Sequence, residues 1–108
     1  IPNSITGIGW GAFRGCKSLE NIIIPQSVVL YIGESAFGDC SSLTSVIIPQ
    51  GITRIGDKTF SGCYNLTNIM LPKSIDEIDW YAFENCDSLT DIYYAGSEYE
   101  WSNIEIDS

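Results

Sequence analysis

The sequence predicts an α/β repeat solenoid: a right-handed superhelix with one short parallel strand per repeat and short helical or 3-10 turns opposite. Two observations predict this architecture. The stretch FSGCYNLTNIMLP at residues 60–72 has three relatives, which start at Phe13, Phe37 and Phe83. These starts lie 24, 23 and 23 residues apart. A fixed period in the twenties is typical of solenoids, in which each repeat buries its apolar side chains against its neighbours.

Each copy changes its apolar spacing part-way, and the change predicts two local structures. In the third copy the apolar residues from Phe60 to Leu66 are three apart, which favours a single helical or 3-10 turn. Ile69 and Leu71 are two apart, the period of a strand. Pro72 then ends the strand, because proline has no N–H to donate to a neighbouring strand.

The rest of each repeat crosses to the next layer. In the third copy this segment contains a second apolar pair, Ile75 and Ile78. A glycine or an aspartate follows the equivalent pair in every copy, which predicts a bend with positive φ; these residues are Gly9, Gly33, Gly56 and Asp79. The second copy has one extra residue within 28–31, which predicts a bulge in an exposed connection.

We expect one domain over residues 1–108, with about four repeats in 1–95 and a C-terminal cap in 96–108. Ser97 and Glu100 form a capping box, which predicts a short helix that places Trp101 and Ile104 over the last repeat. The chain begins without Met in the middle of a repeat, which indicates a segment of a longer protein.

Charge and composition exclude several classes of function. The net charge is −9, and ten carboxylates but no basic residue follow Lys73. Such a surface disfavours nucleic acid and anionic membrane, and no apolar run is long enough to span a bilayer. The chain contains no His and no phosphate-binding loop, so we expect neither an enzyme nor a cofactor. The carboxylates of Asp76, Glu77 and Asp79 lack the ligand spacing of a calcium loop, and we expect no metal site.

The four cysteines recur at one repeat position, at Cys16, Cys40, Cys63 and Cys86. Stacked at steps of about 4.8 Å, their thiolates do not converge on one zinc ion. Free buried thiols that act as small apolar side chains are one interpretation. Disulfides between neighbouring repeats are the alternative, because the spacing of the Cα atoms permits them.

The strand residues that point away from the core form the candidate binding face. Two rows are predicted: a polar row of Asn21, Ser45, Asn68 and Asp91, and an apolar row of Ile23, Ile47, Met70 and Tyr93. A contiguous apolar row on a surface indicates a docking site. The alternative is that Ile is simply favoured on a pleated sheet. Trp10 and Trp80 either shield the outer layer or stack on sugar rings.

The L-x-x-I-x-I-P strand with its F-x-x-C-x-x-L lead-in resembles the bacterial surface-antigen type of leucine-rich repeat, the BspA-like group. The resemblance covers roughly residues 1–95, and the closing YYAGSEYEW stretch is similar to the terminal cap of that family. It implies a leucine-rich repeat superhelix in a secreted or cell-surface bacterial protein whose repeats bind host matrix or other proteins. It implies no catalytic residues.

Two functions remain at this point. The first is a non-enzymatic protein-binding and adhesion module that acts through the predicted face, with a protein ligand ahead of a glycan. The alternative is a rigid spacer that presents another domain of the same protein. Self-association through the open N-terminal end or the strand face is compatible with both.

Overall fold

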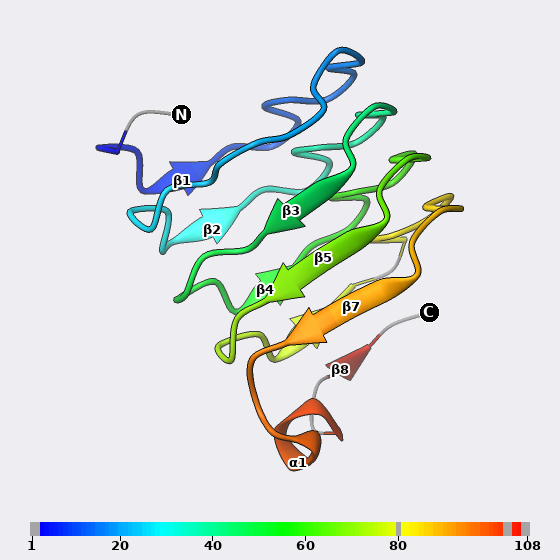
Figure 1. Ribbon diagram of the computed structural model, residues 1–108. Helices are drawn as coiled ribbons and strands as arrows, with labels where there is room; N and C mark the ends of the chain where they lie inside the picture. Colours follow the sequence, from blue (N-terminus) through cyan, green and yellow to red (C-terminus); the bar gives the residue numbers. More distant parts are fainter. Residues whose placement is uncertain (1–2, 80, 103–104, 107–108) are drawn as a thin grey trace.

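The computed structural model describes residues 3–79, 81–102 and 105–106. Successive coils of the chain stack from the N-terminal to the C-terminal end, and every strand pair in the described residues is parallel (Figure 1). The predicted repeat solenoid is therefore confirmed. One short helix, α1 (Glu98–Ser102), lies near the C-terminal end of the described chain.

The first sheet contains the strands predicted from the two-residue spacing. Its strands are β3 (Ser45–Ile47), β5 (Asn68–Leu71) and β7 (Asp91–Tyr94), in the order β3-β5-β7. Pairing joins equivalent positions of successive repeats, for example Ile47 with Met70 and Met70 with Tyr93. In the first repeat the corresponding segment makes only an isolated bridge, between Asn21 and Ser45.

A second row of strands corrects the prediction of one strand per repeat. It comprises β1 (Gly7–Ile8), β2 (Tyr31–Ile32), β4 (Arg54–Ile55), β6 (Glu77–Ile78) and β8 (Glu105–Ile106), which pair as β1-β2 and as β4-β6-β8. Each of these strands is two residues long, too short to show an alternating pattern in sequence. Stacking of the coils, which brings equivalent backbone segments together, creates this second row.

The segments opposite the first sheet are turns. Isolated i→i−3 hydrogen bonds close them, such as Cys63 N–H to the Phe60 carbonyl at 3.2 Å. The described residues contain no 3-10 helix there, so the predicted helical turns are corrected to hydrogen-bonded turns. Left-handed residues interrupt any helix at two positions of each repeat. One position holds Gly11, Ser35, Lys58 and Tyr81, and the other holds Gly15, Asp39, Gly62 and Asn85.

The glycines after the second apolar pair have a different role from the predicted one. Gly9, Gly33 and Gly56 do not have positive φ, so the prediction of a left-handed bend at these positions is wrong. Close approach of the coils explains Gly33. A Cβ atom there would lie 2.6 Å from the carbonyl carbon of Gly9 and from the backbone nitrogen of Trp10. Only glycine allows that approach.

The predicted bulge in the second repeat is present. The backbone N–H groups of Val29 and Leu30 both donate to the Thr6 carbonyl, at 3.2 and 3.1 Å. Both side chains are exposed, while Val28 and Ile32 on either side are buried. The extra residue is thus accommodated at the surface without disturbing the core ladder.

Helix α1 is an insertion in the solenoid. The predicted capping box is confirmed, because Ser97 N–H donates to Glu100 Oε1 at 3.2 Å and Glu100 N–H donates to Ser97 Oγ at 3.1 Å. The bond from Ser97 N–H lowers the pKa of Glu100. Trp101 contacts Tyr94, with ring centroids 5.5 Å apart, whereas Ile104 lies outside the described residues.

Beyond the helix, β8 returns to pair with β6, which corrects the prediction that residues 96–108 only cap the solenoid. Glu77 and Glu105 share one register position although they are 28 residues apart, against 23 for Arg54 and Glu77. The difference equals the five residues of α1. The solenoid therefore resumes in register after the helix.

The core consists of ladders of equivalent side chains. Phe13, Phe37, Phe60 and Phe83 stack with centroids 5.4, 5.5 and 5.7 Å apart and with nearly parallel rings. Phe37 and Phe60 in the middle coils are fully buried, whereas Phe13 and Phe83 at the ends are partly buried. Each coil therefore depends on both neighbours for burial.

The four cysteines are free thiols, as in the first of the two interpretations, but only Cys40 and Cys63 are buried, whereas Cys16 and Cys86 are partly exposed. The thiols of Cys40, Cys63 and Cys86 each donate to the carbonyl oxygen of a phenylalanine in the preceding coil, at 3.1–3.2 Å. Burial raises the pKa of Cys63 to about 12 and that of Cys86 to about 11. The cysteine ladder thus adds coil-to-coil hydrogen bonds to an apolar core position.

We predict that Phe60→Ala lowers the free energy of unfolding by about 3–5 kcal/mol, because it opens a cavity between two packed coils. Phe83→Ala removes the same atoms from a partly buried site and should cost less. Urea denaturation followed by circular dichroism measures both values. Equal losses for the two variants would contradict the ladder interpretation.

Stability should also fall at alkaline pH because of Cys63. Above about pH 9 an unfolded thiol ionises, whereas the folded Cys63 thiol stays protonated up to a pKa of about 12. The unfolded state then binds fewer protons, so this group lowers the free energy of unfolding by up to about 1.4 kcal/mol per pH unit between those values. Urea titrations at several pH values should show a shallower decline for Cys63→Ala. An identical slope in both proteins contradicts the prediction.

Candidate functional site

The apolar row of the candidate face lies at the surface, as predicted. Ile23 is 86% exposed, Ile47 60%, Met70 45% and Tyr93 54%. Along β5, exposed Met70 alternates with buried neighbours on both sides, and the register of the first sheet places Met70 between Ile47 and Tyr93. The pleat of the strands and the parallel register together produce a continuous apolar row.

The polar row lies beside it, two positions earlier on each strand. Asn21 and Asp91 are exposed, and Ser45 and Asn68 are half-buried. Asn68 Nδ2 donates to Thr67 Oγ1 at 3.1 Å. Asp91 is the one charged residue among the eight predicted face residues, so the face presents mainly apolar, amide and hydroxyl groups.

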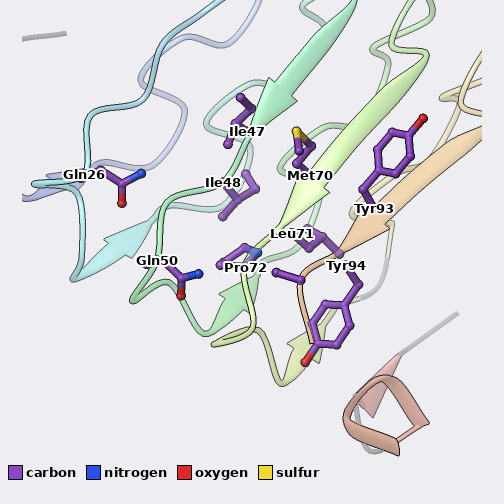
Figure 2. Close-up of a pocket in the computed structure, with 10 residues that line it drawn as sticks. Gln26, Ile47, Ile48, Gln50, Met70, Leu71, Pro72, Tyr93 and Tyr94 are labelled. Carbon is purple, nitrogen blue, oxygen red and sulfur yellow. The ribbon is translucent and has the colours of Figure 1, made fainter. Parts of the chain in front are cut away.

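A shallow hollow of about 320 Å³ opens on this face (Figure 2). Three of the eight predicted residues line it: Ile47, Met70 and Tyr93. Asn21, Ile23, Ser45, Asn68 and Asp91 are not part of its lining. The hollow extends toward the last residue of β7 and the turns that follow the strands. The residues missed by sequence reasoning lie there, namely Gln26, Gln50, Pro72, Tyr94 and Ala95.

A departure from the repeat pattern gives a sequence signal for that extension. Ala95 stands where the other repeats have proline, and this smaller side chain lies at the edge of the hollow. Tyr94 takes the position of the buried Leu71 in the last coil, and its hydroxyl donates to the Lys73 carbonyl at 3.2 Å. Desolvation, followed by the nearby Glu100 carboxylate, raises the pKa of Tyr94.

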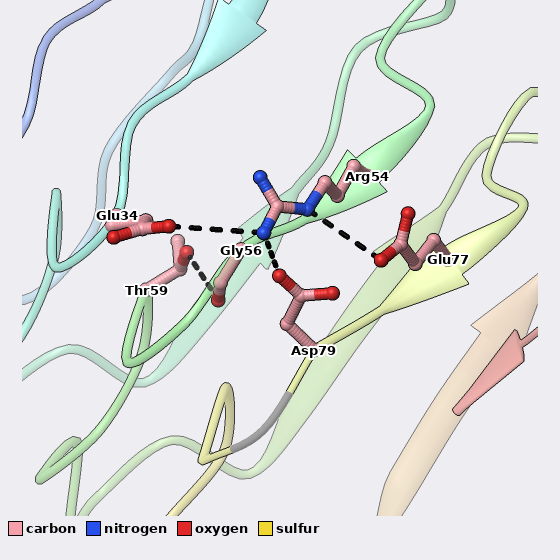
Figure 3. A network of polar contacts seen from close by, with 6 residues as sticks. All are labelled: Glu34, Arg54, Gly56, Thr59, Glu77 and Asp79. Carbon is pink, nitrogen blue, oxygen red and sulfur yellow. Dashed lines mark hydrogen bonds and ion pairs between the residues drawn. The ribbon is translucent and has the colours of Figure 1, made fainter. Parts of the chain in front are cut away.

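Two of the three carboxylates considered for calcium, Glu77 and Asp79, belong to an ion-pair cluster on the second sheet (Figure 3). Arg54 contacts Glu34 at 3.7 Å and Glu77 at 3.8 Å, and it also pairs with the largely buried Asp79. A guanidinium thus takes the position that a cation would need. In the described part of the chain, no group of three or more His, Cys, Asp or Glu residues is arranged to hold a metal ion.

Trp10 does not shield the outer layer of the solenoid. Trp10 is 69% exposed, so the prediction that it packs over the outer layer is wrong. Trp80 lies outside the described residues.

Among the described residues, no helix combines the length and the apolar character needed to cross a bilayer.

Comparison with protein families matches residues 1–104, in six copies, to the family described as BspA type leucine rich repeat region. A comparison with curated proteins finds no match.

Three solved structures are similar over most of the chain. A leucine rich cell surface protein from Faecalibacterium prausnitzii A2-165 is 37% identical, with a TM-score of 0.76, over 100% of this chain and 34% of its own. A leucine-rich repeat protein from Bacteroides ovatus ATCC 8483 is 34% identical, with a TM-score of 0.75, over 82% of this chain and 29% of its own. The T. pallidum leucine rich repeat protein is 26% identical, with a TM-score of 0.81, over 99% of this chain and 47% of its own. The chain therefore spans less than half the length of each.

Proposed function

The chain belongs to the BspA-type leucine-rich repeat family, and from that premise we propose that it is a non-enzymatic protein-binding module of a bacterial surface or secreted protein. The proposed binding face is the outward side of the β3-β5-β7 sheet, with Asn21, Ile23, Ser45, Ile47, Asn68, Met70, Asp91 and Tyr93. The ligand class is a protein, such as a host matrix or surface protein. The role is adhesion.

The observation that carries this proposal is the exposed apolar row. Ile47, Met70 and Tyr93 are each at least 45% exposed, stand at one register position and line one hollow. Large apolar side chains gathered in one patch favour a protein partner, because their burial supplies the energy of association. Flanking amides and hydroxyls can hydrogen-bond to a partner's backbone at the rim.

A surface location is supported by the similarity to a protein described as a cell surface protein. The acidic composition agrees with an extracellular protein that avoids nucleic acid and anionic lipid. A non-enzymatic role is supported by the open geometry of the face, on which Asp91 is the one carboxylate among the eight predicted residues.

We predict that the double variant Met70→Asp with Tyr93→Asp weakens binding of a matrix-protein ligand by at least about 30-fold. Hot-spot residues each contribute more than about 1 kcal/mol, and the added charges would be buried in the complex. A panel of immobilised matrix proteins identifies the ligand, and titration calorimetry then measures the dissociation constant.

The matched control is Val29→Asp with Leu30→Asp, which adds the same charge at two exposed apolar residues of the bulge. This control should bind normally, and circular dichroism should show both variants folded. If the control loses binding and the face variant keeps it, the proposed face is wrong. If no protein binds the wild type, the spacer role replaces this proposal.

A further inference from the structure

A second hollow, of about 560 Å³, opens on the turns that lead into the first sheet. Its polar and aromatic lining comes from three consecutive repeats and consists of Arg14, Lys17, Asp39, Ser41 and Tyr64. None of these residues lines the hollow on the strand face. The proposed protein-binding role therefore makes no use of this second hollow.

The repeat positions explain why the hollow has its own charge. Lys17, Ser41 and Tyr64 occupy one position of successive repeats, and Asp87 occupies the same position in the last repeat. Arg14 occupies another position, which the last repeat fills with Glu84. Two of the five basic residues of an acidic chain thus gather here, while the equivalent positions of the fourth repeat carry carboxylates.

Glycines hold the hollow open. Gly15 and Gly62 have φ of 75° and 76°, so both positions favour glycine, and neither places a side chain in the hollow. A Cβ atom on Gly62 would lie 2.4 Å from Asp39 Oδ1. The Asp39 carboxylate can therefore lie directly over the next coil because Gly62 has no side chain.

The charged groups of the hollow are available to a ligand. In the part of the chain that the structure describes, Lys17 makes no ion pair within 4.0 Å. Arg14 Nε lies 3.8 Å from Asp39 Oδ2, and more than half of each of these side chains is exposed. An exposed pair at that distance contributes little stability and can rearrange around a bound anion. Tyr64 is 50% exposed, so part of its ring is open to contact.

We propose that this hollow binds an acidic sugar, a pyranose that carries a carboxylate, such as a uronic or sialic acid. The sugar carboxylate pairs with Arg14 and Lys17 in charge-assisted hydrogen bonds. The apolar face of the sugar ring packs on Tyr64. The sugar hydroxyls donate to Asp39, and Ser41 Oγ donates to or accepts from them.

Asp39 is the residue that favours a sugar over an acidic peptide or a simple anion. Asp39 repels every negative charge on a ligand, so a singly charged sugar is favoured over a phosphate dianion or a peptide with several carboxylates. The sugar hydroxyl groups can donate hydrogen bonds to the Asp39 carboxylate. The net charge of −9 also disfavours long polyanions, so the ligand is a single acidic residue of a glycan.

The test is a titration of the whole chain with N-acetylneuraminic acid and with glucuronic acid, followed by saturation-transfer NMR and calorimetry. Glucose, inorganic phosphate and a Glu-rich peptide are the comparison ligands. At least one acidic sugar should bind, at least about 10-fold more tightly than glucose, because only its carboxylate engages both cations. Lys17→Ala and Tyr64→Ala should each weaken that binding at least about 5-fold, and Tyr64→Phe should retain it.

Lys73→Ala is the matched control, because it removes one exposed positive charge away from this hollow. Lys73→Ala should leave sugar binding unchanged, and so should the Met70→Asp, Tyr93→Asp variant. A failure of the sugar-site proposal can therefore be distinguished from a failure of the strand-face proposal. Equal binding of phosphate or the peptide that survives Tyr64→Ala would show a plain anion site and overturn the proposal. Absence of binding by both acidic sugars, or equal losses in Lys17→Ala and Lys73→Ala, would overturn it as well.

Discussion

The structure depends on one constraint: the backbone N–H and carbonyl groups of each coil must form hydrogen bonds with those of the adjacent coil. Phe13 N–H donates to the Ala36 carbonyl, Phe37 N–H to the Thr59 carbonyl and Phe60 N–H to the Ala82 carbonyl, at 2.7–2.9 Å. These equivalent bonds hold successive coils at one spacing, and the phenylalanine rings above them consequently stack at 5.4–5.7 Å. Packing and hydrogen bonding thus have the same period, and a single repeat would lack both.

The same constraint assigns different roles to similar residues. An inward position recurs as a buried ladder, and Cys63 keeps a protonated thiol there because the coils exclude water. An outward position recurs as a surface row, and substitutions along that row change the surface without affecting the core. The proposed binding function therefore depends on which side chains occupy the outward positions of neighbouring repeats, as in the row of Ile47, Met70 and Tyr93.

The two proposed sites illustrate two ways of building a surface from repeats. The strand face repeats one kind of residue, so it presents a uniform apolar row. In the hollow on the turns, one repeat position instead holds a different residue in each repeat: Lys17, Ser41 and Tyr64. A cation, a hydroxyl group and an aromatic ring therefore line the same hollow. The first arrangement suits an extended protein surface, and the second suits a small polar ligand.

By itself, the sequence determined which residues stack, because a period of 23 or 24 residues places equivalent positions one above another. It therefore predicted the packing of apolar side chains against the neighbouring repeats, the free thiols as one of two alternatives, the outward rows and the capping box at Ser97. The tertiary structure alone decided contacts between positions that are not equivalent. Arg54 contacts Glu34 and Asp79, which occupy other repeat positions. The hollow beside Met70 extends to Gln50, which lies in the turn after β3. The second row of strands could not be predicted from the sequence either, because a strand of two residues is too short to show an alternating pattern. These segments become strands only when the coils are stacked.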